Sequence, residues 1–268
     1  MSRIGKTFSQ LKVSGRKGFI PFITAGDPDM ANSVEIAVTL AELGADIIEL
    51  GVPFSDPMAD GPTIQRSSMR ALQQDIDLAA VLEIASEIKA RTDVPIVLFT
   101  YYNPLLQFGI EKLCRYSAVI DGLLLTDVIE NEAKVISDKL CENGIDLISL
   151  VAPTTTDARL ETICENARGF IYAVSRAGVT GARNDTAEQA ENLVARIRRF
   201  TKLPIVVGFG ISTADQIADV WRYADAAVVG SAIVAEIEKS GPDGMASERV
   251  REFVGRLLPK FAKTDGQN

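Results

Sequence analysis

Short apolar runs recur along the chain, and segments with the periodicity of amphipathic helices lie between them. Most of the runs are continuous rather than alternating, which is typical of parallel strands covered on both faces. Strand, helix and strand in turn is the order of βαβ units. The pattern predicts eight strands, at residues 19–24, 46–50, 95–100, 122–126, 147–151, 170–174, 204–208 and 226–230.

Eight such repeats that close on themselves form a (β/α)8 TIM barrel of the α/β class, and we expect residues 1–268 to form one domain. An open doubly wound sheet is the alternative. Apolar residues at helical spacing predict the helix after the first strand, over residues 33–43. A short amphipathic helix over residues 4–13 precedes the first strand, and we expect it to plug the N-terminal face of the barrel.

Two of the intervals between strands are longer than the rest. The strands at 46 and 95 begin 49 residues apart and those at 170 and 204 begin 34 apart, whereas the other intervals are 22–27 residues. The loops after strands 2 and 6, residues 51–65 and 175–186, are therefore enlarged. Such loops lie at the carboxyl ends of barrel strands, where active sites are built. Their Gly, Pro and Asp content is also that of ordinary turns, so a purely structural role stays open.

The composition excludes several classes of catalytic and binding site. None of the 268 residues is histidine, which excludes Ser-His-Asp and Cys-His nucleophiles and histidine metal sites. The formal charge of −8 has the wrong sign for binding nucleic acid. No apolar run approaches the roughly 20 residues that span a bilayer. Three widely spaced cysteines indicate neither a disulfide framework nor a thiolate metal site, so we expect a cytoplasmic protein that does not bind membranes.

Glu49 is the one charged residue inside a predicted strand rather than at its end. Alternation along the strand places it on one face with Ile47, while Ile48 and Leu50 lie on the other. Inside a barrel, burial would raise the pKa of this carboxyl toward the range of a general acid or base. An outward Glu49 paired with a helix residue is the alternative.

Asp60 follows in the enlarged loop, within the segment PMADGP. Together with Glu49 it would supply two carboxyls in different environments, an arrangement that lets one act as an acid while the other stays ionised. Asp-Pro and Asp-Gly are also ordinary turn dipeptides, and turn formation alone explains Asp56.

Two glycine turns suggest an anion site in the last third of the chain. One runs through Gly208 and Gly210 into a helix opened by Ser212, with Asp215 as in a capping box, and the other runs through Gly230 and Ser231 into a helix. Helix N-termini at such turns present free N–H groups to a phosphate, although simple strand-to-helix turns look the same. The GFG segment does not match GxGxxG, which disfavours a dinucleotide.

Five segments together resemble one known family, the tryptophan synthase alpha chain. They are PFITAGDP (21–28), ELGVPFSDPMADGPTIQ (49–65), SRAGVTGAR (175–183), GFGIS (208–212) and GSAIV (230–234). The resemblance implies a lyase of tryptophan biosynthesis that cleaves 1-C-(indol-3-yl)glycerol 3-phosphate to indole and glyceraldehyde 3-phosphate. It implies no cofactor in this chain, and a pyridoxal-phosphate beta chain as partner, in an α2β2 complex that receives the indole through a tunnel.

The same resemblance assigns residues by motif. Glu49 matches the catalytic glutamate and Asp60 the catalytic aspartate of the family. The implied substrate contacts are Phe22, Tyr172 and Phe209 for indole and glycerol, Gly181, Gly210, Gly230 and Ser231 for phosphate, and Thr180, which packs against the Asp60 loop; Arg176 matches less firmly.

After the fourth strand the family proline is replaced by Ile129, which leaves the shape of that loop open. Two alternatives to a lyase within a complex also stay open: a stand-alone enzyme that releases indole, and a non-catalytic chain that activates the beta chain. The intact Glu49 and Asp60 argue against the second.

Overall fold

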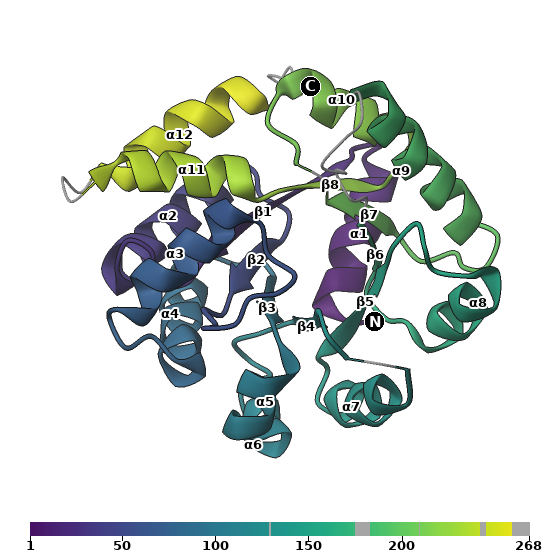
Figure 1. Cartoon of the computed structure of the whole chain (residues 1–268), viewed down its shortest axis with the longest axis horizontal. Coiled ribbons are helices and arrows are strands. Elements are labelled where there is room, and N and C mark those ends of the chain that lie inside the picture. Colours follow the sequence, from purple (N-terminus) through teal and green to yellow (C-terminus); the bar gives the residue numbers. More distant parts are fainter. Residues whose placement is uncertain (129, 175–182, 209, 242–244, 259–268) are drawn as a thin grey trace, which may run out of the picture.

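The computed structural model describes residues 1–128, 130–174, 183–208, 210–241 and 245–258. Its strands are parallel and close into a barrel in chain order, with β8 paired to β1, and a ring of helices surrounds them (Figure 1). The predicted (β/α)8 barrel is confirmed and an open sheet is excluded. The strands are β1 (Gly18–Thr24), β2 (Ile48–Gly51), β3 (Ile96–Thr100), β4 (Gly122–Leu125), β5 (Asp146–Val151), β6 (Ile171–Val174), β7 (Ile205–Gly208) and β8 (Ala226–Val229).

In the described part of the chain, no helix is long and apolar enough to cross a membrane. That residues 1–268 form one domain stays a prediction, because the description ends at residue 258. The helices are α1 (Arg3–Val13), α2 (Met30–Glu42), α3 (Pro62–Leu72), α4 (Leu78–Arg91), α5 (Tyr102–Phe108), α6 (Ile110–Cys114), α7 (Glu130–Glu142), α8 (Asp157–Asn166), α9 (Arg183–Ile197), α10 (Ala214–Tyr223), α11 (Ser231–Lys239) and α12 (Ala246–Leu257).

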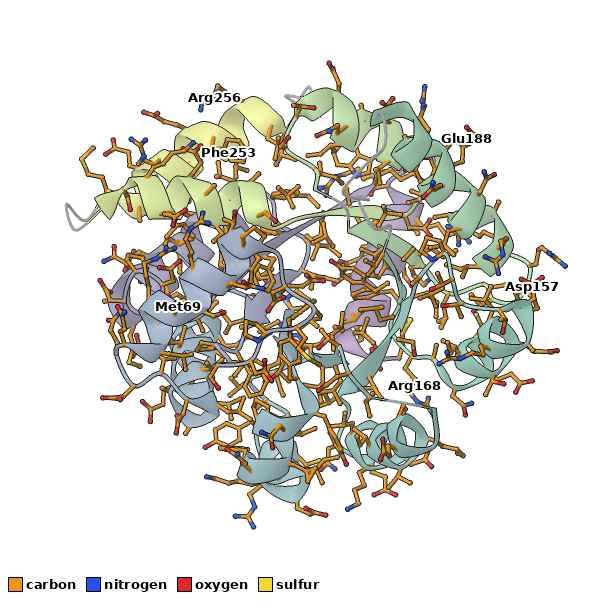
Figure 2. All side chains as sticks on the ribbon, in the orientation of Figure 1. Met69, Asp157, Arg168, Glu188, Phe253 and Arg256 are labelled. Carbon is orange, nitrogen blue, oxygen red and sulfur yellow. The ribbon has the colours of Figure 1, made fainter. Side chains whose placement is uncertain are left out.

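Two apolar clusters divide the core according to the alternation of strand residues. The larger cluster lies between the strands and the outer helices, and it includes Ile48, Leu50 and Leu98. The smaller cluster fills the inside of the barrel and includes Ile20, Ile47 and further inward-facing residues from the other strands. Side chains occupy the interior of the ring in Figure 2, so the barrel is a packed core rather than a pore.

Helix α1 closes the N-terminal end of the barrel, as predicted. Its apolar residues Ile4, Phe8 and Leu11 are buried and belong to the cluster inside the barrel. Arg3 ties the helix to the start of β4, because its Nε lies 3.3 Å from an oxygen of Asp121. In Figure 1 this helix, drawn in purple, lies across the centre of the ring. The opposite end of the barrel, where the strands end, is therefore the end left for a site.

Local chemistry explains where the elements differ from their predicted bounds. Every strand begins and ends within two residues of its predicted position. Helix α2 begins three residues before the predicted helix, because the Asp29 side chain accepts a hydrogen bond from the backbone N–H of Asn32 and caps it.

The long intervals between strands contain helix as well as loop. Residues 62–65 of the segment predicted as a loop begin α3, with Pro62 at its first position, where a missing N–H costs nothing. Two helices, α3 and α4, therefore account for most of the distance between β2 and β3. After β6, residues 183–186 belong to α9, and residues 175–182 lie outside the described chain.

Candidate active site

Glu49 points into the barrel. Its strand neighbours Ile48 and Leu50 belong to the outer cluster, whereas Ile47, on the same face as Glu49, belongs to the inner one. In the strand register Glu49 lies beside Phe22 of β1 and Val97 of β3, both of which also face inward. The outward-facing alternative is excluded.

The Glu49 carboxyl is fully buried, with 0% of the residue exposed. Neither of its oxygens has a hydrogen-bond partner within the described chain. Burial without a partner disfavours the charged form and raises the pKa of Glu49 to about 8. At neutral pH this carboxyl is therefore mainly protonated and can donate a proton inside the apolar interior of the barrel.

An aromatic wall borders Glu49 on the β1 side. The ring of Phe22 lies 5.4 Å from that of Phe99, centre to centre, and nearly perpendicular to it. Gly51 makes room for Phe22, because a Cβ at residue 51 would lie 2.5 Å from the Phe22 ring. The two perpendicular rings form an apolar, aromatic corner, and aromatic ligands pack edge-to-face or offset against such rings.

Tyr172 of β6 also faces the interior of the barrel. The residue is 7% exposed, and burial together with the charge of Glu49 raises the pKa of its hydroxyl well above the usual value. Its hydroxyl lies over Gly208, where a Cβ would come within 2.1 Å of the oxygen. Only glycine at residue 208 leaves this position to the tyrosine.

Asp60 lies in the loop between β2 and α3 and is half-buried. Burial raises the pKa of its carboxyl to about 6, and a hydrogen bond with the Tyr101 side chain limits the rise. The Tyr101 hydroxyl also accepts a hydrogen bond from the backbone N–H of Ala59, at 2.9 Å. Asp60 is therefore mostly ionised at pH 7, whereas Glu49 is mostly protonated.

Sequence reasoning missed three residues at the carboxyl ends of the strands. Tyr101, just after β3, contacts Asp60 although 41 positions separate the two residues. The hydroxyls of Thr24 and Thr126, at the ends of β1 and β4, are buried and have no hydrogen-bond partner in the described residues. A polar residue at the last position of a predicted barrel strand, or directly after it, was the signal that would have found all three.

The N-terminus of α11 lies at the end of β8 and is open. Gly230 precedes the helix and supplies no side-chain cap, while its carbonyl accepts hydrogen bonds from Ile233 and Val234. Ser231, the first residue of the helix, is exposed. Free backbone N–H groups at such a helix start attract anions. That this helix start binds the phosphate stays a prediction.

The capping box predicted at Ser212 and Asp215 is wrong by one position. Thr213 is the residue that caps α10, and its partner is Gln216. The backbone N–H of Ser212 also donates to the Gln216 side chain, at 2.8 Å. The Thr213 hydroxyl accepts from the N3 backbone N–H and so competes better for the cap than Ser212. Gly210 has a φ of +48°, a backbone conformation that favours glycine.

Several residues expected at the site cannot be placed. Thr180, Gly181 and Phe209, together with Arg176, lie outside the described residues, and so does Ile129, which replaces the family proline. Beside Ile129, the Asp127 side chain accepts a hydrogen bond from the backbone N–H of Tyr102, at 2.7 Å. This bond joins the start of the loop after β4 to helix α5.

The described residues contain no group of three or more Cys, Asp or Glu side chains that could hold a metal ion. Glu49, Asp60, the rings of Phe22 and Phe99 and the start of α11 are the candidate groups that the described residues place at this end of the barrel. Together they offer a proton donor, a carboxylate, an aromatic surface and a place for an anion around the mouth of one barrel.

Comparisons with known proteins show the family of this chain. The model of the family described as tryptophan synthase alpha chain matches residues 8–259. The tryptophan synthase alpha chain of Geobacter sulfurreducens is 49% identical over 259 residues, which are 96% of this chain and 98% of the relative. That of Thermoanaerobacter sp. is 43% identical over the same length and shares.

Solved structures show the same fold. The tryptophan synthase subunit alpha of Legionella pneumophila superposes with a TM-score of 0.88 at 35% identity, covering 96% of this chain and 97% of that one. A tryptophan synthase chain from M. tuberculosis, in an aminoacrylate-bound form, gives a TM-score of 0.86 at 34% identity, covering 96% and 98%. The chain thus belongs to the tryptophan synthase alpha chain family, whose members cleave 1-C-(indol-3-yl)glycerol 3-phosphate to indole and glyceraldehyde 3-phosphate.

Proposed function

We propose that this chain performs the cleavage with Glu49 as the group that both donates and accepts a proton. The observation that carries the proposal is the Glu49 carboxyl itself, fully buried inside the barrel and without a hydrogen-bond partner in the described residues. A buried carboxyl with a strongly raised pKa, near the carboxyl ends of barrel strands, is typical of an acid–base catalyst.

The reaction needs two proton transfers around one carbon–carbon bond. Protonated Glu49 donates to C3 of the indole ring, which makes the ring an acceptor for the bond electrons. The Glu49 carboxylate then takes the proton of the hydroxyl on the glycerol carbon bonded to indole. The C–C bond breaks, its electrons return to the ring, and indole and an aldehyde result. Glu49 ends protonated, as it began.

Asp60 stabilises the cation that exists between these transfers. Its carboxylate accepts a hydrogen bond from the indole N–H and faces the positive charge that develops on the ring. This role requires an ionised Asp60, which a pKa of about 6 supports at neutral pH. Two carboxyls thus take different parts because their burial differs.

The remaining site residues hold the substrate. Phe22 and Tyr172 contact the indole ring and the glycerol chain, together with Phe209 outside the described part. Thr24 and Thr126 supply hydroxyls for the glycerol chain, since both lack other partners there. The phosphate binds between the turn after β7, with Gly210, and the start of α11, with Gly230 and Ser231, together with Gly181. Thr180 packs against the Asp60 loop.

Tyr101→Phe tests how Asp60 is kept ionised. The wild-type kcat/KM should depend on pH as a bell, falling below about 6 and above about 8 as the two carboxyls titrate. Because the Tyr101 hydrogen bond lowers the pKa of Asp60, its loss should move the acidic limb to higher pH and leave the alkaline limb in place. Tyr223→Phe, at the far end of α10, is the control. An unmoved acidic limb would show that Tyr101 does not act on Asp60.

We also infer that the protein works in the cytoplasm with a beta chain that carries pyridoxal phosphate, in an α2β2 complex, and uses no cofactor of its own. Family membership supports the partner, and the absence of any disulfide among Cys114, Cys141 and Cys164 supports a reducing compartment.

An indole-release assay on 1-C-(indol-3-yl)glycerol 3-phosphate, with and without a cognate beta chain, tests the proposal. We expect slow release by the isolated chain and faster turnover in the complex. Equal, fast rates in both would support the stand-alone lyase instead. No indole in either, with a beta chain still activated by this protein, would establish the non-catalytic alternative.

A further inference from the structure

Two neighbouring helices, α3 and α11, each begin near one end of the proposed substrate. Helix α3 begins at Pro62, two residues after Asp60, and α11 begins at Ser231, in the proposed phosphate site. The helices lie side by side in Figure 1, and Figure 2 shows Met69 on the outer surface of α3, where it is 61% exposed. The relative position of the two helices therefore sets the distance between Asp60 and the phosphate.

Asp27, in the loop after β1, holds α3 in place through two residues of that helix. Its carboxylate is 1% exposed and accepts hydrogen bonds from the Ser67 hydroxyl and from two nitrogens of Arg70, Nε and Nη2, each at 2.8 Å. A buried carboxylate is tolerated only when it is paired and fully hydrogen-bonded. The fork of Arg70 satisfies this need in one geometry and so holds α3 in one position.

Glu238, near the end of α11, joins that helix to α3. Arg66 donates two hydrogen bonds to its carboxylate, both at 2.7 Å, and Nη1 of Arg70 donates a third at 2.9 Å. Hydrogen bonding by Arg66, with a smaller contribution from Arg70, lowers the pKa of Glu238 to about 2. The acid is thus ionised at every pH at which the protein would work, and Arg70 bridges Asp27 and Glu238.

Asp60 is tied to the same helix by its backbone. Nε2 of Gln65, on the first turn of α3, donates to the Asp60 carbonyl at 2.9 Å. The next residue along the chain is Arg66. A displacement of α3 relative to α11 would therefore carry Asp60 with it.

We propose that Asp27, Arg66, Arg70 and Glu238, here called the α3 clamp, are positioning residues that set the place of Asp60 relative to the bound phosphate. The inference rests on the proposed function, because it assumes that Asp60 acts on the indole ring. The clamp touches neither ring nor phosphate. It matters because a misplacement of about 1 Å can cost about 10²-fold in rate.

Glu238→Ala tests the clamp, because it removes the α3–α11 arm and leaves the buried Asp27–Arg70 pair intact. We expect kcat to fall by about three- to ten-fold, while KM and the affinity for glycerol 3-phosphate, measured by calorimetry, stay within about two-fold. Arg66→Met should behave in the same way. Arg91→Met is the matched control, since it breaks an equally two-pronged pair with Glu35 between α4 and α2, and it should leave kcat unchanged.

The decisive comparison repeats Glu238→Ala in the Asp60→Asn background. If the clamp acts through Asp60, the second substitution should lower kcat no further, because the group it positions has already been lost. The same fold-loss in both backgrounds, or a lowered melting temperature with unchanged kcat, would overturn the clamp alone. A wild-type rate in Asp60→Asn by itself would instead overturn the proposed role of Asp60.

Discussion

Glu49→Gln should reduce indole release by about 10²- to 10⁴-fold, the contribution expected of an acid–base group. The amide has nearly the shape of the carboxyl but can neither donate the proton to the ring nor take the hydroxyl proton back. Binding of glycerol 3-phosphate should be unchanged, because the proposed phosphate site lies at the start of α11, away from Glu49. The measurement is single-turnover indole formation together with calorimetry of glycerol 3-phosphate.

The same variant has a stability readout that does not depend on activity. Wild-type Glu49 keeps its proton in the folded state up to about pH 8, whereas in the unfolded chain it releases it near 4.5. Unfolding of the wild type is therefore increasingly favoured as pH rises from 4.5 to 8, by about 1.4 kcal/mol per unit at most. Glu49→Gln lacks this dependence. The difference between its free energy of unfolding and that of the wild type should therefore grow in favour of the variant from pH 4.5 to 8 and stay constant below and above that window.

Asp46→Asn is the matched control for the indole-release readout. Asp46 lies just before β2, where it accepts a hydrogen bond from the backbone N–H of Phe19 and pairs with Arg16 at the N-terminal end of the barrel. Asp46→Asn also replaces a carboxyl by an amide, but at the opposite end of the barrel, and it should leave kcat near the wild-type value. Appreciable turnover by Glu49→Gln would refute the acid–base assignment.

Asp60→Asn should lower kcat by about 10²- to 10³-fold, as does the loss of one electrostatic group that faces the transition state. The amide still accepts a hydrogen bond from the indole N–H, but it carries no charge to balance the cation on the ring. KM should change little, because the ground-state ring is neutral. Steady-state kinetics of indole release by the isolated chain provide the measurement.

Asp56→Asn, an exposed position in the same loop, serves as the control for Asp60. The substitution is the same, but turn formation alone accounts for an aspartate at this position. The kcat of the isolated chain should therefore stay at the wild-type value. If Asp60→Asn kept the wild-type rate, or lost no more than Asp56→Asn, the electrostatic role would be wrong.

Much of the fold follows from local patterns. The strands are visible in the sequence because a strand covered on both faces must be apolar along its whole length, and their spacing leaves room for one helix in most intervals. Glu49 stood out for the same reason, as a charge within such a strand. The longest interval was harder, because the Gly, Pro and Asp residues before Pro62 are turn formers, and they hid the fact that α3 starts there.

Contacts between distant segments were beyond the reach of such patterns. Tyr101 reaches Asp60 only because β2 and β3 are neighbours in the barrel. Arg70 contacts Glu238 across 168 positions because β8 closes on β1 and brings α11 beside α3.

By itself the sequence determined the eight strands, the carboxyls able to carry the chemistry and the family to which the chain belongs. Only the tertiary structure decided that Glu49 lies inside the barrel without a hydrogen-bond partner among the described residues, and that Tyr101 and α3 hold Asp60. The reason is physical: apolar periodicity is a property of each segment, whereas burial, pKa and hydrogen-bond partners arise when the barrel closes and brings distant segments together.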